Sequence, residues 1–207
     1  MEKRMVTVYT FDEIIDSPTV QDTAKRRARQ FMTSLYDNHE WHDYIIDHWT
    51  NIELPKRGYE NAQIFFSLGF SQGDYAVFDA DIYGYQLLHN NSLSYYYPSL
   101  SRYLKRQESE SHIGRVVRES NTSYVRMHDS SEIGKVSSVC MQDIVILGKF
   151  IEGDVKKINS EIYVELRDEY MFITSDEELS RSAKVNKYVF FRDGRPAHHL
   201  TKELETT

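Results

Sequence analysis

The sequence predicts an α+β fold in which helices pack on one face of a mainly antiparallel sheet built from hairpins. Two stretches, 62–82 and 113–128, each contain paired segments rich in β-branched and aromatic residues around a polar turn, which is the pattern of a β-hairpin. Hairpin strands pair antiparallel, and antiparallel sheets are commonly covered on one face only. Elsewhere apolar residues recur every three or four positions, which predicts amphipathic helices.

The beginning of the chain predicts a short strand followed by a helix. The strand is expected around Val6, Tyr9 and Phe11. A helix should begin at Ser17-Pro18, because serine is a favoured N-cap and proline fits the first helical position. Its inward face has spacings of three and four residues: Val20, Ala24, Ala28, Phe31 and Leu35.

A second helix, from about 40 to 51, is expected before the first hairpin. Its apolar stripe also has helical spacing: Trp41, Tyr44, Ile45, His48, Trp49 and Ile52. Pro55 and Gly58 should end this helix, and we expect its stripe to lie in the main core. The hairpin over 62–82 then turns at Ser71–Asp74.

A third, short helix and the second hairpin follow. The helix should span Pro98–Gln107, and three of its side chains should point inward: Leu100, Tyr103 and Leu104. The strands 113–119 and 123–128 are expected to join through Asn121-Thr122.

The longest predicted helix runs from 141 to about 172. Its apolar residues keep helical spacing: Ile144, Leu147, Ile151, Val155, Ile158, Ile162, Leu166 and Tyr170. Gly148 and Gly153 each weaken it by about 1 kcal/mol relative to alanine. Thr174-Ser175-Asp176-Glu177 predicts a capping box before a last short helix, and 188–191 predicts a final strand.

Composition indicates one folded domain in a reducing compartment. The chain has 207 residues, 40% hydrophobic and 13% aromatic, which fits one medium domain, or one domain with a smaller appendage. We expect a single α+β domain over 1–195 and a polar, flexible tail over 196–207. Cys140 is the only cysteine, which excludes an internal disulfide and a multi-cysteine zinc site. The start of the chain lacks an apolar signal core, and no run approaches ~18 apolar residues, so a soluble cytosolic protein without a membrane partner is expected.

The charge favours a protein partner over nucleic acid. The net charge is −7, whereas sequence-independent binding of nucleic acid normally needs a basic surface. An acidic surface suits a partner that itself has a basic groove. The fifteen tyrosines exceed what a core needs, and tyrosine is favoured at interfaces.

The turn between the two strands of the first hairpin supports two interpretations. Gly73 suits a position with positive φ, and Ser71 and Asp74 suit hydrogen bonds to the turn backbone, so the turn is architectural in the first interpretation. In the second it is a recognition tip that presents Gln72 and Tyr75. The partner-binding candidates are therefore two groups of residues: Gln72, Asp74 and Tyr75 in the turn, and Tyr95, Tyr96 and Tyr97 in a tyrosine run.

The segment Phe65-Phe66-Ser67-Leu68-Gly69-Phe70-Ser71-Gln72-Gly73-Asp74-Tyr75-Ala76 resembles the "FSGFWSQGDGA" hairpin motif of a group of small bacteriophage proteins, some of which are labelled antitoxins. The opening Val6–Glu13, the segment Tyr124–His128 and the ending Tyr170–Gly194 resemble the same group in the same order, so the likeness spans roughly 5–195. Phe70 and Tyr75 depart from the motif, which has Trp and Gly there. The resemblance implies a phage origin.

Two other classes of function have candidate residues. Nucleic-acid binding would use six cations: Lys25, Arg26, Arg27, Arg29, Arg115 and Arg118. A metal-dependent enzyme would use a histidine–acid cluster: His39, Glu40, His42, Asp43, Asp47 and His48. A hydrolytic relay would need Ser71, Asp74 and His128 to meet, but Ser71 is not in a strand–turn–helix elbow. No glycine-rich phosphate loop is present.

These observations together favour binding over catalysis. We expect a phage-encoded cytosolic protein, without cofactor or metal, that inhibits or redirects a host protein such as a toxin or a nucleic-acid-binding defence factor. Self-association into a homo-oligomer stays open. The alternatives are a nucleic-acid-binding regulatory protein and a metal-dependent enzyme. Ser71, Gly73, Ser175 and Glu177 are expected to be structural.

Overall fold

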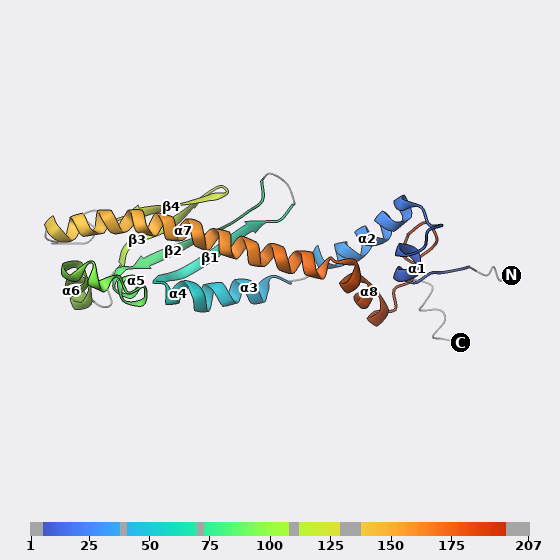
Figure 1. The fold of residues 1–207 in the computed structure, drawn as a ribbon, viewed down its shortest axis with the longest axis horizontal. Coiled ribbons are helices and arrows are strands. Elements are labelled where there is room, and N and C mark those ends of the chain that lie inside the picture. The colour runs from blue at the N-terminus through green and yellow to red at the C-terminus, as the bar shows by residue number, and fades with distance from the viewer. Residues whose placement is uncertain (1–5, 38–40, 70–72, 108–111, 129–137, 198–207) are drawn as a thin grey trace. The chain divides into compact units, whose positions relative to one another are not determined.

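The computed structural model describes residues 6–37, 41–69, 73–107, 112–128 and 138–197 (Figure 1). Their contacts divide the chain into two compact units. Unit 1 combines residues 1–41 and 168–207, and unit 2 comprises 42–167. The predicted α+β class is confirmed, whereas a single domain over 1–195 stays a prediction, because helix α7 (Ser138–Ile173) contributes to both units.

Unit 2 contains a four-stranded antiparallel sheet in the order of the chain. Its strands are β1 (Tyr59–Ser67), β2 (Tyr75–Tyr83), β3 (His112–Glu119) and β4 (Thr122–Met127). β1 and β2 form the first predicted hairpin, and β3 and β4 form the second. Both hairpins are confirmed: β1 and β2 pair as far as Ser67 and Tyr75, and β3 and β4 pair as far as Glu119 and Thr122, across a two-residue turn.

Helix α7 packs along one face of this sheet (Figure 1). Its predicted inward residues are buried: Ile144, Leu147, Ile151, Val155, Ile158, Ile162 and Leu166, with Tyr170 half-buried. The buried Tyr59 hydroxyl of β1 donates to Asp154 Oδ2 of α7 at 2.8 Å, and burial raises the pKa of Tyr59 well above its ordinary value. The helix is continuous through Gly148 and Gly153.

The predicted second helix is correct in place but wrong in its phase and its end. It comprises α3 (Asp43–His48), a π turn η1 (Trp49–Glu53) and α4 (Leu54–Lys56). Pro55 does not end the helix, since α4 follows the π turn directly and runs to Lys56. The helix ends just before Gly58, whose φ is +90°.

The apolar stripe of this helix is only partly buried. Ile45 and Trp49 are buried, but Tyr44 and Ile52 are exposed. The π turn widens the helix and rotates Ile52 away from the line of Trp49. Trp41 belongs to unit 1 and packs on Tyr170, with ring centroids 5.6 Å apart.

Three short helices complete unit 2. They are α5 (Gly84–Asn90), the 3₁₀ turn η2 (Leu93–Tyr95) and α6 (Pro98–Gln107). Helix α6 has the predicted bounds, with Leu100 and Leu104 buried and Tyr103 half-buried.

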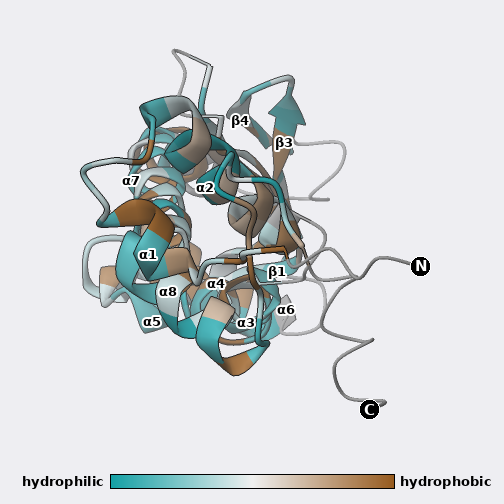
Figure 2. Cartoon of the chain, turned by 90° about the vertical axis from the view of Figure 1, so that its right-hand side faces the viewer, coloured by the Kyte–Doolittle hydropathy of each residue, from teal (hydrophilic) through white to brown (hydrophobic). Residues whose placement is uncertain are grey.

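Unit 1 is a small helical assembly of α1 (Phe11–Ile15), α2 (Asp22–Asp37) and α8 (Asp176–Val185). Hydrophilic and hydrophobic residues alternate along these helices (Figure 2). Their apolar sides meet in one core: Phe11, Ile14, Val20, Ala24, Ala28, Met32, Leu179, Ala183 and Phe190.

The first predicted strand is wrong at its end. Phe11 begins α1, because Thr10 and Glu13 form a reciprocal capping box, and the pairing is reduced to a bridge between Tyr9 and Phe190. The predicted strand over 188–191 is likewise limited to isolated bridges.

Two predicted helix starts are displaced. Helix α2 begins at Asp22 rather than at Ser17-Pro18, because the Ser17 hydroxyl bonds Thr19 and the chain turns there. The cap of α8 is Ser175, whose hydroxyl accepts from the Glu178 N–H at 3.3 Å, so the cap lies one residue later than predicted and Glu177 lies inside the first turn.

The tail predicted over 196–207 does not begin at residue 196. Ala197 is buried, and its N–H donates to the Val189 carbonyl oxygen at 2.7 Å. Residues 198–207 lie outside the described part of the chain.

Candidate functional site

The turn between β1 and β2 carries the first group of predicted recognition residues. Ser71 and Gln72 lie outside the described residues, so their roles stay predictions. Asp74 Oδ1 accepts a hydrogen bond from the Gly69 N–H at 2.8 Å, and Tyr75, which opens β2, is half-buried. The Asp74 carboxylate thus satisfies a backbone donor, as the architectural interpretation requires.

Replacing Asp74 by alanine is expected to lower the free energy of unfolding by about 1 kcal/mol, because the Gly69 N–H loses its acceptor. Urea unfolding measures the change, and Asp74→Asn, which keeps an acceptor oxygen, should cost less. Gly73, the residue before Asp74, is exposed. Unchanged stability together with lost partner binding would make the turn a recognition tip.

The second group contains the most exposed large aromatic side chains among the described residues. Tyr95 and Tyr96 are 87% and 72% exposed, and their rings meet edge to face with centroids 5.6 Å apart. Tyr97 is half-buried. The N–H groups of Tyr96 and Tyr97 donate to the Leu93 carbonyl oxygen at 2.9 and 3.2 Å. We call Tyr95 and Tyr96 the tyrosine pair.

The backbone under the tyrosine pair is held on both sides. Leu88 of α5 and Leu100 of α6 are fully buried, and Ser92 adopts a left-handed conformation with φ of +58° where the chain leaves α5. Two rings are therefore presented to solvent on a short helical turn that is anchored in the core of unit 2.

The six candidate cations are divided between the two units, four on α2 in unit 1 and two on β3 in unit 2. In unit 1, Arg29 donates through Nε and Nη2 to both carboxylate oxygens of Asp176, at 2.6 and 2.7 Å. This two-pronged pair lowers the pKa of Asp176. Lys25 and Arg26 make no ion pair with any described residue.

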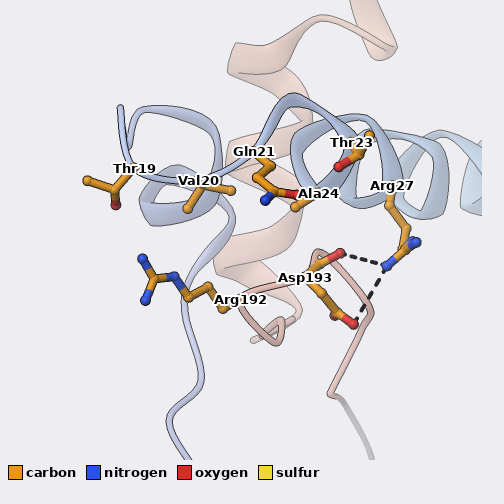
Figure 3. Close-up of a pocket in the computed structure, with 8 residues that line it drawn as sticks. All are labelled: Thr19, Val20, Gln21, Thr23, Ala24, Arg27, Arg192 and Asp193. Atoms are coloured by element: carbon orange, nitrogen blue, oxygen red, sulfur yellow. Dashed lines mark hydrogen bonds and ion pairs between the residues drawn. The ribbon is translucent and has the colours of Figure 1, made fainter.

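Arg27 lines a pocket of about 490 Å³ in unit 1 (Figure 3). It donates to the Asp193 carbonyl oxygen at 2.9 Å, and its guanidinium lies 3.6 Å from the Asp193 carboxylate. Arg192, also in the lining, makes no hydrogen bond or ion pair within the described chain. In the described structure, the pocket therefore offers a bound anion one unpaired cation, Arg192. The neighbouring Asp193 carboxylate would repel such an anion.

The two cations of β3 are also engaged. Arg115 Nε lies 2.9 Å from Asp81 Oδ1 in an ion pair, and the Arg118 guanidinium lies 4.0 Å from the centre of the Phe65 ring. The structure thus gives three of the six candidate cations, Arg27, Arg29 and Arg115, a carboxylate partner.

The predicted metal-binding cluster is only partly described, because His39 and Glu40 lie outside the described residues. His42 Nδ1 lies 3.1 Å from Asp43 Oδ1, and His48 is exposed. Within the described ranges, no three histidine, cysteine or carboxylate side chains converge as metal ligands.

The relay of Ser71, Asp74 and His128 is not assembled. Asp74 directly precedes the first residue of β2. His128 lies beside the far end of that strand, where its backbone N–H donates to the Ile113 carbonyl oxygen. Nine strand residues span roughly 27 Å. The carboxylate and the imidazole are therefore a strand length apart.

Sequence reasoning missed a histidine pair at that far end. His112 Nδ1 and His128 Nε2 lie 3.0 Å apart, so one nitrogen donates and the other accepts. His112 Nε2 faces Asp81 Oδ1 at 3.6 Å, too far for a hydrogen bond, and Asp81 also binds Arg115.

The register of the second hairpin explains why the pair was missed. A turn at Asn121-Thr122 would place Arg115 opposite His128. The structure turns one residue earlier, with Ser120 in a left-handed conformation, and this shift brings Ile113 opposite His128. A one-residue change of register moves each strand residue to a new cross-strand neighbour.

Lowering the pH is expected to destabilise the protein through His112. Burial and the neighbouring His128 lower the pKa of His112 below 6.5, against the opposing effect of Asp81 and with a smaller contribution from Arg115. The unfolded chain therefore binds a proton at His112 at higher pH than the folded chain does. The stability that the neutral His112 contributes is complete above the unfolded pKa, and it is lost as the pH falls through about 6.5 towards the folded pKa.

Urea unfolding at pH 8 and at pH 5.5 measures this effect. His112→Gln should reduce the pH dependence, whereas His89→Gln, at an exposed histidine of α5, should leave it in place. An equal pH dependence in wild type and His112→Gln would contradict the assignment.

Comparisons of the chain with protein-family models, with curated proteins and with solved structures found no match. The likeness to small bacteriophage proteins thus stays a prediction. No helix in the described parts of the chain has the length and apolar character needed to cross a bilayer.

Proposed function

We propose that the protein is a phage-encoded accessory protein that binds a host protein in the host cytoplasm and inhibits or redirects it without catalysis. The observation that carries this proposal is the tyrosine pair, Tyr95 and Tyr96, which stands in solvent on a backbone anchored in the core. The resemblance of the sequence to small bacteriophage proteins supports the phage origin.

A tyrosine pair of this kind suits protein recognition. Each aromatic side chain buries about 150–250 Å² when it is covered, and Tyr is enriched among the residues that dominate interface energies. Tyr has few rotatable bonds, and the η2 backbone is already ordered, so little conformational freedom is lost on binding.

The charge of the chain indicates what kind of protein the partner is. A net charge of −7 attracts a basic surface and speeds its encounter at low salt. A toxin or defence factor with a basic nucleic-acid groove has such a surface. We therefore expect the affinity for the partner to fall as the salt concentration rises.

Affinity purification of the tagged protein from infected host cells, with nuclease treatment, tests the proposal. Wild type should retain one host protein after the nuclease step, and the double variant Tyr95→Ser, Tyr96→Ser should lose at least 90% of it. Tyr124→Ser is the matched control, because Tyr124 is also exposed but lies on the sheet. Equal capture by the double variant would contradict the proposal.

The rival function, nucleic-acid binding, has a separate test. Purified protein should bind DNA and RNA only at the non-specific level of ~10⁻⁴ M or weaker at physiological salt. The informative variant is Lys25→Glu with Arg26→Glu, because these two cations have no carboxylate partner among the described residues. Submicromolar binding that this variant abolishes would replace the proposal by its rival.

A further inference from the structure

The outer face of α7 is apolar although it faces solvent. Val145, Ile146 and Phe150 are 61%, 55% and 41% exposed. Successive helix residues are about 100° apart, so Ile146 lies about 160° around the helix from the buried Ile144. Ile146 therefore lies away from the face that packs on the sheet, and all three side chains are exposed in the described structure.

The two glycines of α7 differ in a way that bears on this face. A Cβ added at Gly148 would come within 3.1 Å of Met127 Cγ, so packing on the sheet explains that glycine. A Cβ at Gly153 would meet nothing within 4 Å. Glycine weakens a helix relative to alanine, and no contact in the described part of the chain compensates for this at Gly153.

Gly153 lies on the line of the exposed apolar residues. It follows Ile146 by seven residues, which is two helical turns, and follows Phe150 by three. The distance between two packed helices depends on the side chains at their contact. Because Gly153 has no side chain and lies beside two exposed apolar residues, it leaves room for another helix to approach closely.

We propose that this face binds a second copy of the chain, with the two α7 helices antiparallel about a two-fold axis at Phe150. Positions equally far before and after Phe150 then lie opposite each other. Ile146, four residues before it, lies opposite position 154 of the other copy, so its side chain lies beside the adjacent Gly153, three residues after Phe150. A two-fold axis repeats this contact on both sides, so the surface is complementary to itself.

The charges on this face fit the same arrangement. Asp143 and Lys157 lie seven residues before and after Phe150, so each copy places its Asp143 opposite Lys157 of the other. Asp143 makes no ion pair with any described residue of its own chain, and Lys157 makes only a long one, 3.7 Å from Glu161.

Analytical ultracentrifugation of the purified protein between about 5 and 200 µM tests the proposal, over the range in which small interfaces associate. Wild type should shift from monomer towards dimer as the concentration rises. Phe150→Glu should remain monomeric throughout. Val185→Glu should behave as wild type, because it puts the same charge at an exposed apolar residue of α8. A monomeric wild type, or a Phe150→Glu protein that still dimerises, would overturn the proposal.

A charge exchange tests the antiparallel arrangement. Asp143→Lys alone and Lys157→Asp alone should each weaken association, and the double variant should restore it. Fourteen residues of helix separate the two positions by about 21 Å, so a rescue cannot arise within one helix. Failure of the double variant to recover would reject this register.

Gly153→Ala separates an interface role from a purely local one. Alanine should raise the urea midpoint of the dilute monomer, because it favours the helix, and should weaken dimerisation about tenfold, because its methyl group meets Ile146 of the other copy. A stabilised protein with unchanged dimerisation would show that Gly153 is outside the contact and would overturn the proposed packing.

Discussion

Replacing Gly194 by alanine is expected to lower the free energy of unfolding by about 3–5 kcal/mol. Gly194 has φ of +80°, and an added Cβ would lie 2.0 Å from the Ala24 carbonyl oxygen of α2. Alanine is strained at this φ, and the oxygen that it meets belongs to backbone inside a helix, which cannot turn aside. The turn that holds the buried Phe190 against the core of unit 1 should therefore be displaced.

Urea unfolding of Gly194→Ala and Gly194→Asn separates the two causes. Asparagine tolerates a left-handed backbone but still carries a Cβ, so it should be destabilising by about 1 kcal/mol less than alanine. Gly153→Ala, measured on dilute protein, is the control for a glycine with open space around it. A Gly194→Ala protein that unfolds with wild-type stability would show that the turn does not approach α2 this closely.

Replacing Trp49 by alanine is expected to lower the free energy of unfolding by about 3–5 kcal/mol. Trp49 is only 5% exposed, its Nε1 donates to Glu165 Oε2 at 2.7 Å, and the Arg57 guanidinium lies 5.5 Å from its ring centre. The substitution therefore removes a large buried ring and also leaves a carboxylate of α7 without its donor.

Trp49→Phe divides these contributions, because it keeps an aromatic ring and removes the N–H. We expect it to cost about 1.5–3 kcal/mol, the range for a hydrogen bond to a charged group. Trp41→Phe, at a half-buried ring of unit 1, is the matched control and should cost less. Trp49→Ala with a stability within 1 kcal/mol of wild type would mean that the ring is not part of the core.

Long periodic patterns and polar turns were sufficient to predict much of the fold. The spacing of Ile144 to Leu166 predicted the buried face of α7, and both hairpins were predicted from turns between apolar segments. These signals are local, since they depend on residues only a few positions apart. The errors occurred where side chains compete for the backbone, as Thr10 and Glu13 do at α1, or where a π turn changes the helical phase.

The candidate site was less predictable because its contacts are long-range. Arg29 pairs with Asp176, 147 residues away, and Arg27 with Asp193, 166 residues away, so the sequence could not indicate that these cations have partners. The histidine pair depended on a one-residue register at the Ser120 turn. Tyr95 and Tyr96 were named from their residue type, but only the structure reveals that both are exposed.

Photo-crosslinking in infected cells measures directly whether the tyrosine pair contacts a host protein. A benzophenone amino acid replaces Tyr96 in one variant and Tyr124, the sheet control, in another. We predict one crosslinked host protein at position 96, resistant to nuclease, and none of it at position 124. No protein adduct at position 96, or an adduct of equal yield at both positions, would contradict the account.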